Sequence, residues 1–338
     1  MGRNRDWIKA TLAHRETGAV PYNFMFSPPA LAAVQEHFGT DDIEAALDLP
    51  IRMSGCTSIK PLYAPPAKYG PAITDEFGVV WSTSDIDRGS PTGPAMAGPD
   101  LSGYDFPDPV DERRFGALGP WCRANAEHFT VLWAGDLWER ATFMRGMEGL
   151  LLDVAANPGF VEALLGGIAD YILWTMAILF ERFEFDAVAI SDDYGTQRAM
   201  IISPADWRRL IKPLLAEVFA LAKRHGRYTF LHSCGHIVPI IGDLIEIGLD
   251  ILHPIQPEAM DVHELKRRFG PDLTFCGGLG TQGLLPAGKP AQVREAVAGL
   301  KETMGRGGGY ILEPGITLQA DMPLANMVAM VEEARRAD

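Results

Sequence analysis

The sequence predicts an α/β fold, a (β/α)8 TIM barrel, on two observations. Short apolar or β-branched runs alternate with long helical patterns, above all in the second half of the chain, as expected for parallel strands joined by crossover helices. Eight such runs are present, which is the strand number of this barrel. Because α/β barrels of more than about 250 residues fold as single units, we expect one barrel domain spanning residues 1–338.

The predicted strands are short runs rich in apolar, aromatic or β-branched side chains. They lie at 21–24, 56–60 (a weak run), 130–134, 187–190, 228–232, 251–254, 273–276 and 309–312. Parallel strands of a barrel end on one face, and the active sites of this fold lie there. Polar residues at the ends of these runs are therefore the first candidates for function.

The predicted helices lie between these strands, at 7–15, 29–38, 158–183, 204–224, 236–247, 262–269, 290–304 and 324–336. The 204–224 helix has the clearest signals. Ser203 can cap its first turn, Pro204 suits its first position, and Gly226 marks its end.

Residues 61–120 interrupt this alternation and contain ten of the 25 prolines. We interpret them as a Pro/Gly-rich excursion over the carboxyl-end mouth of the barrel, with a small hairpin near 77–81, rather than as a second domain. Four aromatic residues in or directly after this segment form either the walls of a pocket for a flat organic substrate or part of the core. They are Trp81, Tyr104, Phe106 and Trp121.

Composition and charge exclude several classes of protein. The chain has 44 acidic and 30 basic residues and a net charge of −14, which disfavours binding to nucleic acid. Residues 1–6 are polar, unlike a signal peptide, and the apolar stretch at 160–180 contains Glu162 and Asp170, unlike a membrane span. Four cysteines without an export signal indicate reduced thiols. We expect a cytoplasmic protein with no membrane partner. The oligomeric state stays open, with a homo-oligomer as one alternative.

Three soft donors lie at neighbouring strand ends. His232 and Cys234 are two residues apart, so an extended chain directs both side chains to the same side. Cys276 ends a strand two further along, at the same level of the barrel. Two thiolates and one imidazole suit Zn²⁺, and three protein ligands with a fourth exchangeable position are typical of a catalytic site.

The sequence leaves alternatives open for the fourth zinc ligand and for the acid–base residues. Glu313 is the first choice for the fourth position, with Gln256 or water as the second. Asp192 and Asp193 either cap a following helix or serve as catalytic residues that donate a proton or orient the substrate. A simpler alternative makes the two cysteines small buried core residues. Their common position at strand ends favours the metal.

The sequence resembles the uroporphyrinogen decarboxylase superfamily over nearly its whole length. The matching segments are FLHSCG at 230–235, GLDILHPIQP at 248–257, FCGG at 275–278, GGYIL at 308–312, TDEFG at 74–78 and SDDYGTQ at 191–197. This resemblance implies a (β/α)8 barrel with one of two chemistries. These are cofactor-free decarboxylation of a tetrapyrrole, and zinc-dependent methyl transfer to or from a corrinoid protein.

The resemblance favours the zinc-dependent corrinoid methyltransferase branch. Decarboxylases of the superfamily bind substrate carboxylates with an Arg-Gln-Ala-Gly-type segment, and this chain has YNFMF at 22–26 instead. Few Arg or Lys residues lie at the strand ends, although each buried carboxylate of such a substrate needs a partner. The methyltransferases bind zinc with His-x-Cys and a distant Cys, which correspond to His232, Cys234 and Cys276.

The resemblance is greatest to the methyltransferases of O-demethylase systems, partly through EPGIT at 313–317. It implies that Zn²⁺ polarises the oxygen of a small aryl methyl ether while Co(I) of a separate corrinoid protein accepts the methyl group, so cobalamin comes from the partner. Three alternatives stay open. They are methyl transfer from a methylcorrinoid to a thiol such as coenzyme M, cofactor-free uroporphyrinogen decarboxylation, and a non-enzymatic corrinoid-binding scaffold.

Overall fold

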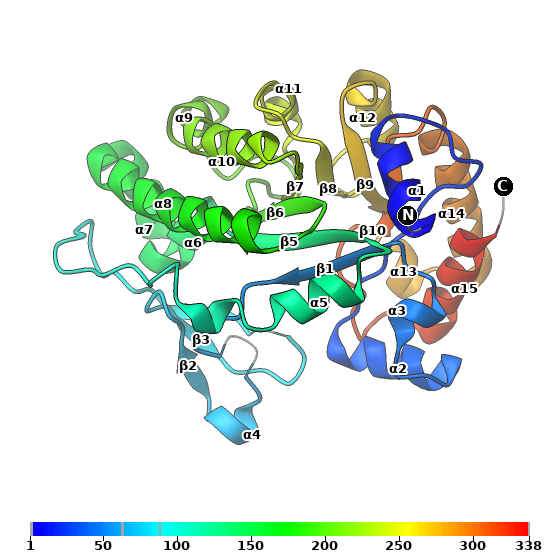
Figure 1. Cartoon of the computed structure of the whole chain (residues 1–338), viewed down its shortest axis with the longest axis horizontal. Coiled ribbons are helices and arrows are strands. Elements are labelled where there is room, and N and C mark those ends of the chain that lie inside the picture. Colours follow the sequence, from blue (N-terminus) through cyan, green and yellow to red (C-terminus); the bar gives the residue numbers. More distant parts are fainter. Residues whose placement is uncertain (1–2, 62–63, 88, 337–338) are drawn as a thin grey trace.

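A curled sheet of seven parallel strands forms the centre of the computed structural model, which describes residues 3–61, 64–87 and 89–336 (Figure 1). In spatial order the strands are β1 (Ile51–Gly55), β5 (Phe129–Gly135), β6 (Ala187–Ser191), β7 (Tyr228–His232), β8 (Ile251–Ile255), β9 (Thr274–Leu279) and β10 (Tyr310–Pro314). Each strand pairs with the next one along the sheet in parallel. The observed α/β fold is therefore TIM-barrel-like.

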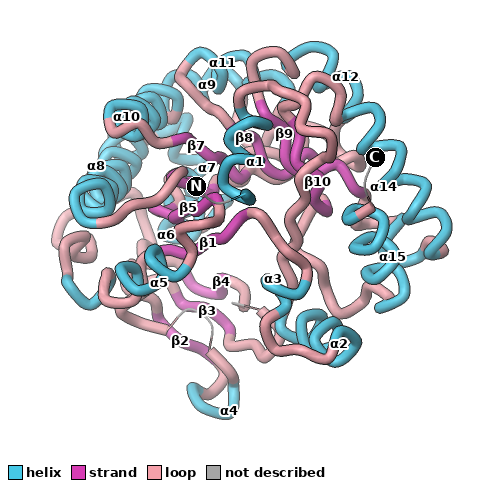
Figure 2. The backbone as a smooth tube through the Cα atoms, turned by 45° about the vertical axis from the view of Figure 1, so that its right-hand side comes forward, coloured by secondary structure: helices cyan, strands magenta, loops and turns pink. Residues whose placement is uncertain are grey.

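Helices surround this sheet (Figure 2). The longer ones are α1 (Arg3–Leu12), α2 (Pro28–Phe38), α5 (Leu118–Ala124), α6 (Trp138–Arg145), α7 (Met147–Ala156), α8 (Pro158–Arg182), α9 (Pro204–Leu210), α10 (Lys212–Arg224), α12 (Val262–Phe269), α14 (Pro290–Met304) and α15 (Leu324–Arg335). The short ones are α3 (Ile43–Ala46), α4 (Pro66–Tyr69), α11 (Ile241–Glu246), α13 (Leu284–Ala287) and the 3-10 turns η1 (Glu112–Arg114) and η2 (Val238–Ile240).

The sheet has a seam between its first and last strands. The strand predicted at 21–24 forms only isolated parallel bridges, from Tyr22 to Leu312 of β10 and from Phe26 to Leu318. Within the described residues, no ladder joins this segment to β1, whose partner is β5. The eighth strand of the predicted barrel is therefore a bridging segment.

The strand predicted at 56–60 was wrong, because β1 occupies the preceding residues, Ile51–Gly55. The sequence pattern conceals this strand because Arg52 lies within it. The structure buries Arg52 to 4% exposure, where its guanidinium donates to the carbonyl oxygens of Leu49 and Ile51 and lies 3.2 Å from the carboxylate of Glu44. A buried, paired arginine is tolerated where an unpaired one would not be.

The interior of the curled sheet is filled by alternate side chains of the strands. This layer includes Ile51, Phe129, Val131, Ala187, Ala189, Phe230, Ile251, Cys276 and Ile311. Ile8 and Leu12 of α1 pack against the same side chains. The interior is thus a packed apolar core, as barrel interiors are, and its polar groups lie nearer the carboxyl ends of the strands.

The excursion at 61–120 contains a small antiparallel sheet of β2 (Ala72–Thr74), β3 (Val80–Ser82) and β4 (Pro91–Gly93), and β2 and β3 form a hairpin around the predicted position. Asp75 fixes the hairpin turn. It is fully buried and accepts hydrogen bonds from the backbone of Phe77 and Val79 and from the indole of Trp81, each at 2.9 Å. Arg140 of α6 donates to the same carboxylate at 2.9 Å. This ion pair attaches the excursion to the barrel.

Two predicted helices are divided in the structure. The 204–224 helix breaks at Ile211 into α9 and α10, because Pro213 at the start of α10 has no amide hydrogen to continue the ladder. The 236–247 helix consists of η2 and α11, and Pro239 lies in the 3-10 turn. The sequence pattern also missed α6 and α7, where apolar residues occur on all sides.

Helix α8 is, within the described residues, the one helix long and apolar enough to cross a membrane by length and composition. In the fold, 56% of its most apolar window is buried. Leu164, Ile168 and Ile172 are at most 1% exposed in the main core. The prediction of a buried core helix is confirmed.

We predict that Asp75→Ala destabilises the fold by roughly 3–5 kcal/mol, the usual cost of breaking a buried ion pair from one side. Arg140 would lose one of its two carboxylate partners, and three buried N–H donors would lose their acceptor. Urea unfolding measures the change. Asp85→Ala in the same excursion, where the carboxylate is exposed, is the control and should change stability by less than about 0.5 kcal/mol. Equal stability of the two variants would contradict this role.

Candidate metal centre

Strand register brings two histidines together at the carboxyl ends of β7 and β8. His232 is paired with His253 across the parallel ladder. Because side chains alternate along a strand, each histidine projects on the same side as an apolar residue of the interior layer, Phe230 and Ile251 respectively. The two Nδ1 atoms lie 2.9 Å apart.

An outer group of donors lies on one side of this pair. Its members are Asp193, His232 and Cys234, all partly buried, with their donor atoms within 4.8 Å of one another. The Cys234 Sγ lies 3.5 Å from His232 Nε2, and Asp193 Oδ1 lies 3.6 Å from the same nitrogen. The backbone amide of Cys234 donates to Asp193 Oδ1 at 2.8 Å, which fixes the carboxylate.

An inner group lies on the other side and is almost completely buried. It consists of His253, Cys276 and Glu313, which are 1%, 0% and 3% exposed. Cys276 donates from Sγ to Glu313 Oε2 at 2.9 Å, and His253 Nε2 lies 3.7 Å from that oxygen. His253 Nε2 has no hydrogen-bond partner. A buried polar atom left without a partner is costly, and it marks a position that a ligand can satisfy.

The environment opposes ionisation of both thiols. Burial, followed by the charge of Asp193, raises the pKa of Cys234. Burial and the charge of Glu313 raise the pKa of Cys276 well above its ordinary value. A bound metal ion reverses this because it deprotonates a coordinating thiol. Both thiols lie beside a carboxylate, so a cation would offset negative charge on each side.

The donors have the chemistry and spacing of a zinc site. Nitrogen, sulfur and carboxylate oxygen are the three donor types that Zn²⁺ takes in proteins, and two donors of one tetrahedral ion lie about 3.5 Å apart. The distance from His232 Nε2 to Cys234 Sγ, 3.5 Å, agrees with that spacing. The residues present therefore fit zinc.

The four predicted ligands are divided between the two groups. His232 and Cys234 belong to the outer group and Cys276 and Glu313 to the inner one. Sequence reasoning missed His253. The signal was available, since His253 follows the inward-facing Ile251 by two residues, as His232 follows Phe230.

The two predicted catalytic aspartates have different surroundings. Asp193 faces His232 in the outer group. Asp192 is fully buried and accepts hydrogen bonds from the backbone amides of Leu137 and Glu139 and from the Tyr194 hydroxyl, at 2.7–2.9 Å. Burial raises the pKa of Asp192 well above its ordinary value. Asp192 thus fixes the start of α6, a helix that precedes it in the chain, rather than capping a following helix.

Gln256, the second choice for the fourth ligand, connects two loops instead. Its Oε1 accepts from the amide of Gly235 at 2.6 Å, and its Nε2 donates to the carbonyl of Gly315 at 3.2 Å. Gly235 itself has a positive φ of 80°, and a Cβ there would overlap the backbone of Gly195. Glycine after Cys234 is therefore required for the loop to hold the outer group.

Comparison with known proteins agrees with this architecture. The sequence profile described as uroporphyrinogen decarboxylase (URO-D) matches residues 134–337, more than half of the chain. The chain belongs to the URO-D family. The matched region contains β6 to β10 and both donor groups, so the proposed site of this URO-D family member lies wholly within it.

Solved structures share the fold of this URO-D family member. A methyltransferase from Methanosarcina mazei is similar with a TM-score of 0.73 at 16% sequence identity, over 99% of this chain and 98% of that chain. At this identity the likeness establishes a common fold. A search of curated proteins found no significant match.

We predict that Cys234→Ser and Cys276→Ser each weaken zinc binding by at least about 100-fold, because loss of a supporting contact alone costs roughly 10–100-fold. Competition with a chromophoric chelator measures the affinity. Cys122→Ser, which changes a buried cysteine of α5 outside both groups, is the control. Unchanged zinc affinity in both site variants would refute the metal centre.

Proposed function

We propose that this URO-D family member is a zinc-dependent methyltransferase. It moves a methyl group from an aryl methyl ether to the Co(I) of a separate corrinoid protein. The observation that supports this most is the set of nitrogen, sulfur and carboxylate donors on or directly after strands β6 to β10, with His232 at the end of β7 and His253 and Cys276 within β8 and β9. Cofactor-free decarboxylation has no use for two thiols beside two histidines.

One zinc ion is proposed per chain, with His232, Cys234, Cys276 and Glu313 as its ligands. This ligand set requires the outer and inner groups to close on one ion, because the donor atoms that lie within 4.8 Å of one another belong to two separate groups. The ring of His253 contacts that of His232. His253 is proposed to hold the His232 ring in position from the interior of the curled sheet. When bound, zinc supplies Lewis acidity that polarises the ether oxygen. In the proposed transfer the electron pair of the partner's Co(I) would form the new bond to the methyl carbon, and the electron pair of the broken C–O bond would stay on the ether oxygen.

The residues of this chain orient the ether, control water and supply a proton to the departing oxygen. Asp193 is proposed as the proton donor, since its side chain is 38% exposed and faces the outer group. Asp192 keeps the adjacent loop in place through its hydrogen bonds to α6. The excursion, attached through Asp75 and Arg140, shields the mouth, because water competes with the reaction.

The whole chain is proposed to act as one barrel domain whose cobalamin comes from the partner protein. The segment at 22–26, which corresponds to the carboxylate-binding segment of the decarboxylases, is apolar here. Phe24 is 3% exposed, and Asn23 donates to Glu313 Oε1 at 3.3 Å. This contact makes the segment part of the donor site and disfavours an octacarboxylate substrate.

The test is methyl transfer from 1,2-dimethoxybenzene to a Co(I) corrinoid protein, followed by the spectrum of the methylated corrinoid. We expect transfer that stops when a chelator removes zinc and returns when zinc is restored. Asp193→Asn should slow it by roughly 10²-fold or more, the usual size of a general-acid contribution. Transfer to coenzyme M but from no ether would instead support the thiol alternative. Full activity without zinc would contradict the proposal.

A further inference from the structure

A cavity of about 720 Å³ lies at the seam of the curled sheet. Its two walls come from the two edges that no ladder joins within the described residues. Phe24 and Phe26 belong to the bridging segment, and Ile51 and Met53 belong to β1. The volume is in the range of pockets that bind small organic molecules.

This cavity is linked to the inner donor group through Asn23. Ile51 is a member of the interior layer that also contains Cys276, and Met53 packs against that layer. Asn23 lines the cavity and donates to Glu313 Oε1 at 3.3 Å. A molecule in the cavity would therefore lie one side chain away from a proposed zinc ligand.

The lining combines apolar side chains with carboxylates and uncharged polar residues, the last being Asn23, Ser27, Gln35, Thr317 and Gln319. The apolar side chains are Phe24, Met25, Phe26, Leu31, Ile43, Ile51, Met53 and Ile86. The carboxylates are Asp41, Asp42 and Asp87, which are exposed, and Glu44, which pairs with Arg52. None of the described lining residues is Lys, Arg or His. Such a surface favours a neutral, apolar occupant over an anion, because a carboxylate or sulfonate transferred here would lack a cationic partner.

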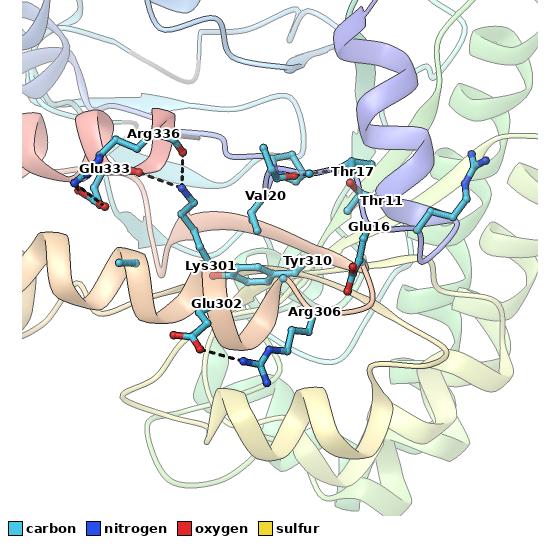
Figure 3. A pocket seen from close by; sticks show the side chains of 17 residues that line it. Thr11, Glu16, Thr17, Val20, Lys301, Glu302, Arg306, Tyr310, Glu333 and Arg336 are labelled. Atoms are coloured by element: carbon cyan, nitrogen blue, oxygen red, sulfur yellow. Dashed lines mark hydrogen bonds and ion pairs between the residues drawn. The ribbon is translucent and has the colours of Figure 1, made fainter. Parts of the chain in front are cut away.

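A second cavity, of about 510 Å³, has a different character (Figure 3). It includes Tyr310, the first residue of β10, and lies near the amino end of that strand. Its lining contains Arg306 and Lys301, and Lys301 donates to the carbonyl oxygens of Glu333 and Arg336 at 3.4 and 2.6 Å. Neither cavity is lined by a member of the two donor groups, but the seam cavity is lined by Asn23, which is hydrogen-bonded to Glu313 of the inner group. The second cavity therefore serves as the control.

We propose that the seam cavity binds the body of the methyl donor, that this donor is neutral and apolar, and that Met53 sets the size of the donor that fits. This inference rests on the proposed function and adds the position and class of the substrate. Met53 is a specificity-determining residue in this account, since it lines the cavity, packs against the interior layer and belongs to neither donor group.

Binding is measured by NMR titration of zinc-loaded protein with 1,2-dimethoxybenzene as the probe. Met53→Trp fills the cavity and should weaken binding at least tenfold. Met53→Ala enlarges it and should improve binding of the larger 2-methoxynaphthalene relative to 1,2-dimethoxybenzene. Ala298→Phe, which places bulk in the cavity of Figure 3, is the control and should leave both affinities unchanged. Zinc content and melting temperature of each variant show that the fold is intact.

Charge selectivity is tested with 4-methoxytoluene and 4-methoxybenzoate, which differ chiefly by a negative charge. The neutral ether should bind at least tenfold more tightly. The inference is overturned if Met53→Trp, folded and loaded with zinc, binds the probe as the unchanged protein does, or if the anion binds as well as the neutral ether. Either result leaves the proposed function standing, because that function depends on zinc and methyl transfer rather than on Met53.

Discussion

The register between β7 and β8 is the constraint on which the donor site depends. It pairs His232 with His253 and places both rings toward the interior, with the Nδ1 atoms 2.9 Å apart. A slip of one residue would turn one histidine to the helical side of the sheet. The buried apolar layer beneath the histidines, with Phe230 and Ile251 as members, fixes that register. The packing of the core thereby determines the geometry of the site.

The same burial gives the site its chemical character. Two thiols whose pKa values are raised by burial lie beside carboxylates, and His253 Nε2 has no partner. Without a cation the thiols stay protonated and His253 Nε2 stays unsatisfied, whereas a metal ion would take nitrogen, sulfur and carboxylate donors together. Loops held by Asp192 and Gln256 keep the donors in position, so rigidity is provided by residues that do not themselves face the outer group.

Much of this architecture was predictable from the sequence. Strands β5 to β10 follow the predicted runs closely, because each is a short apolar segment buried on both faces, the usual pattern of parallel strands. β1 was misplaced because a buried, ion-paired Arg52 looks like a surface residue in a sequence. The seam was not predictable. The sequence pattern does not show that the segment at 21–24 bridges to β10 but forms no described ladder with β1.

At the site, the sequence pointed to His232, Cys234, Cys276 and Glu313, and the structure divides them between two adjacent groups. His253 escaped notice because its strand is otherwise apolar, and the pairing of β7 with β8 is invisible in a single sequence. The two aspartates differ for a local reason. Adjacent residues of a nearly extended chain point in opposite directions, so Asp193 faces His232 while Asp192 turns toward α6.

X-ray absorption at the zinc edge of the purified protein tests the central claim most directly. The account predicts one zinc ion per chain with two sulfur ligands at about 2.3 Å and nitrogen or oxygen ligands at about 2.0–2.2 Å. A zinc ion without sulfur ligands would contradict it. Two ions per chain with one sulfur each would also contradict it, because the two donor groups would then bind metal separately.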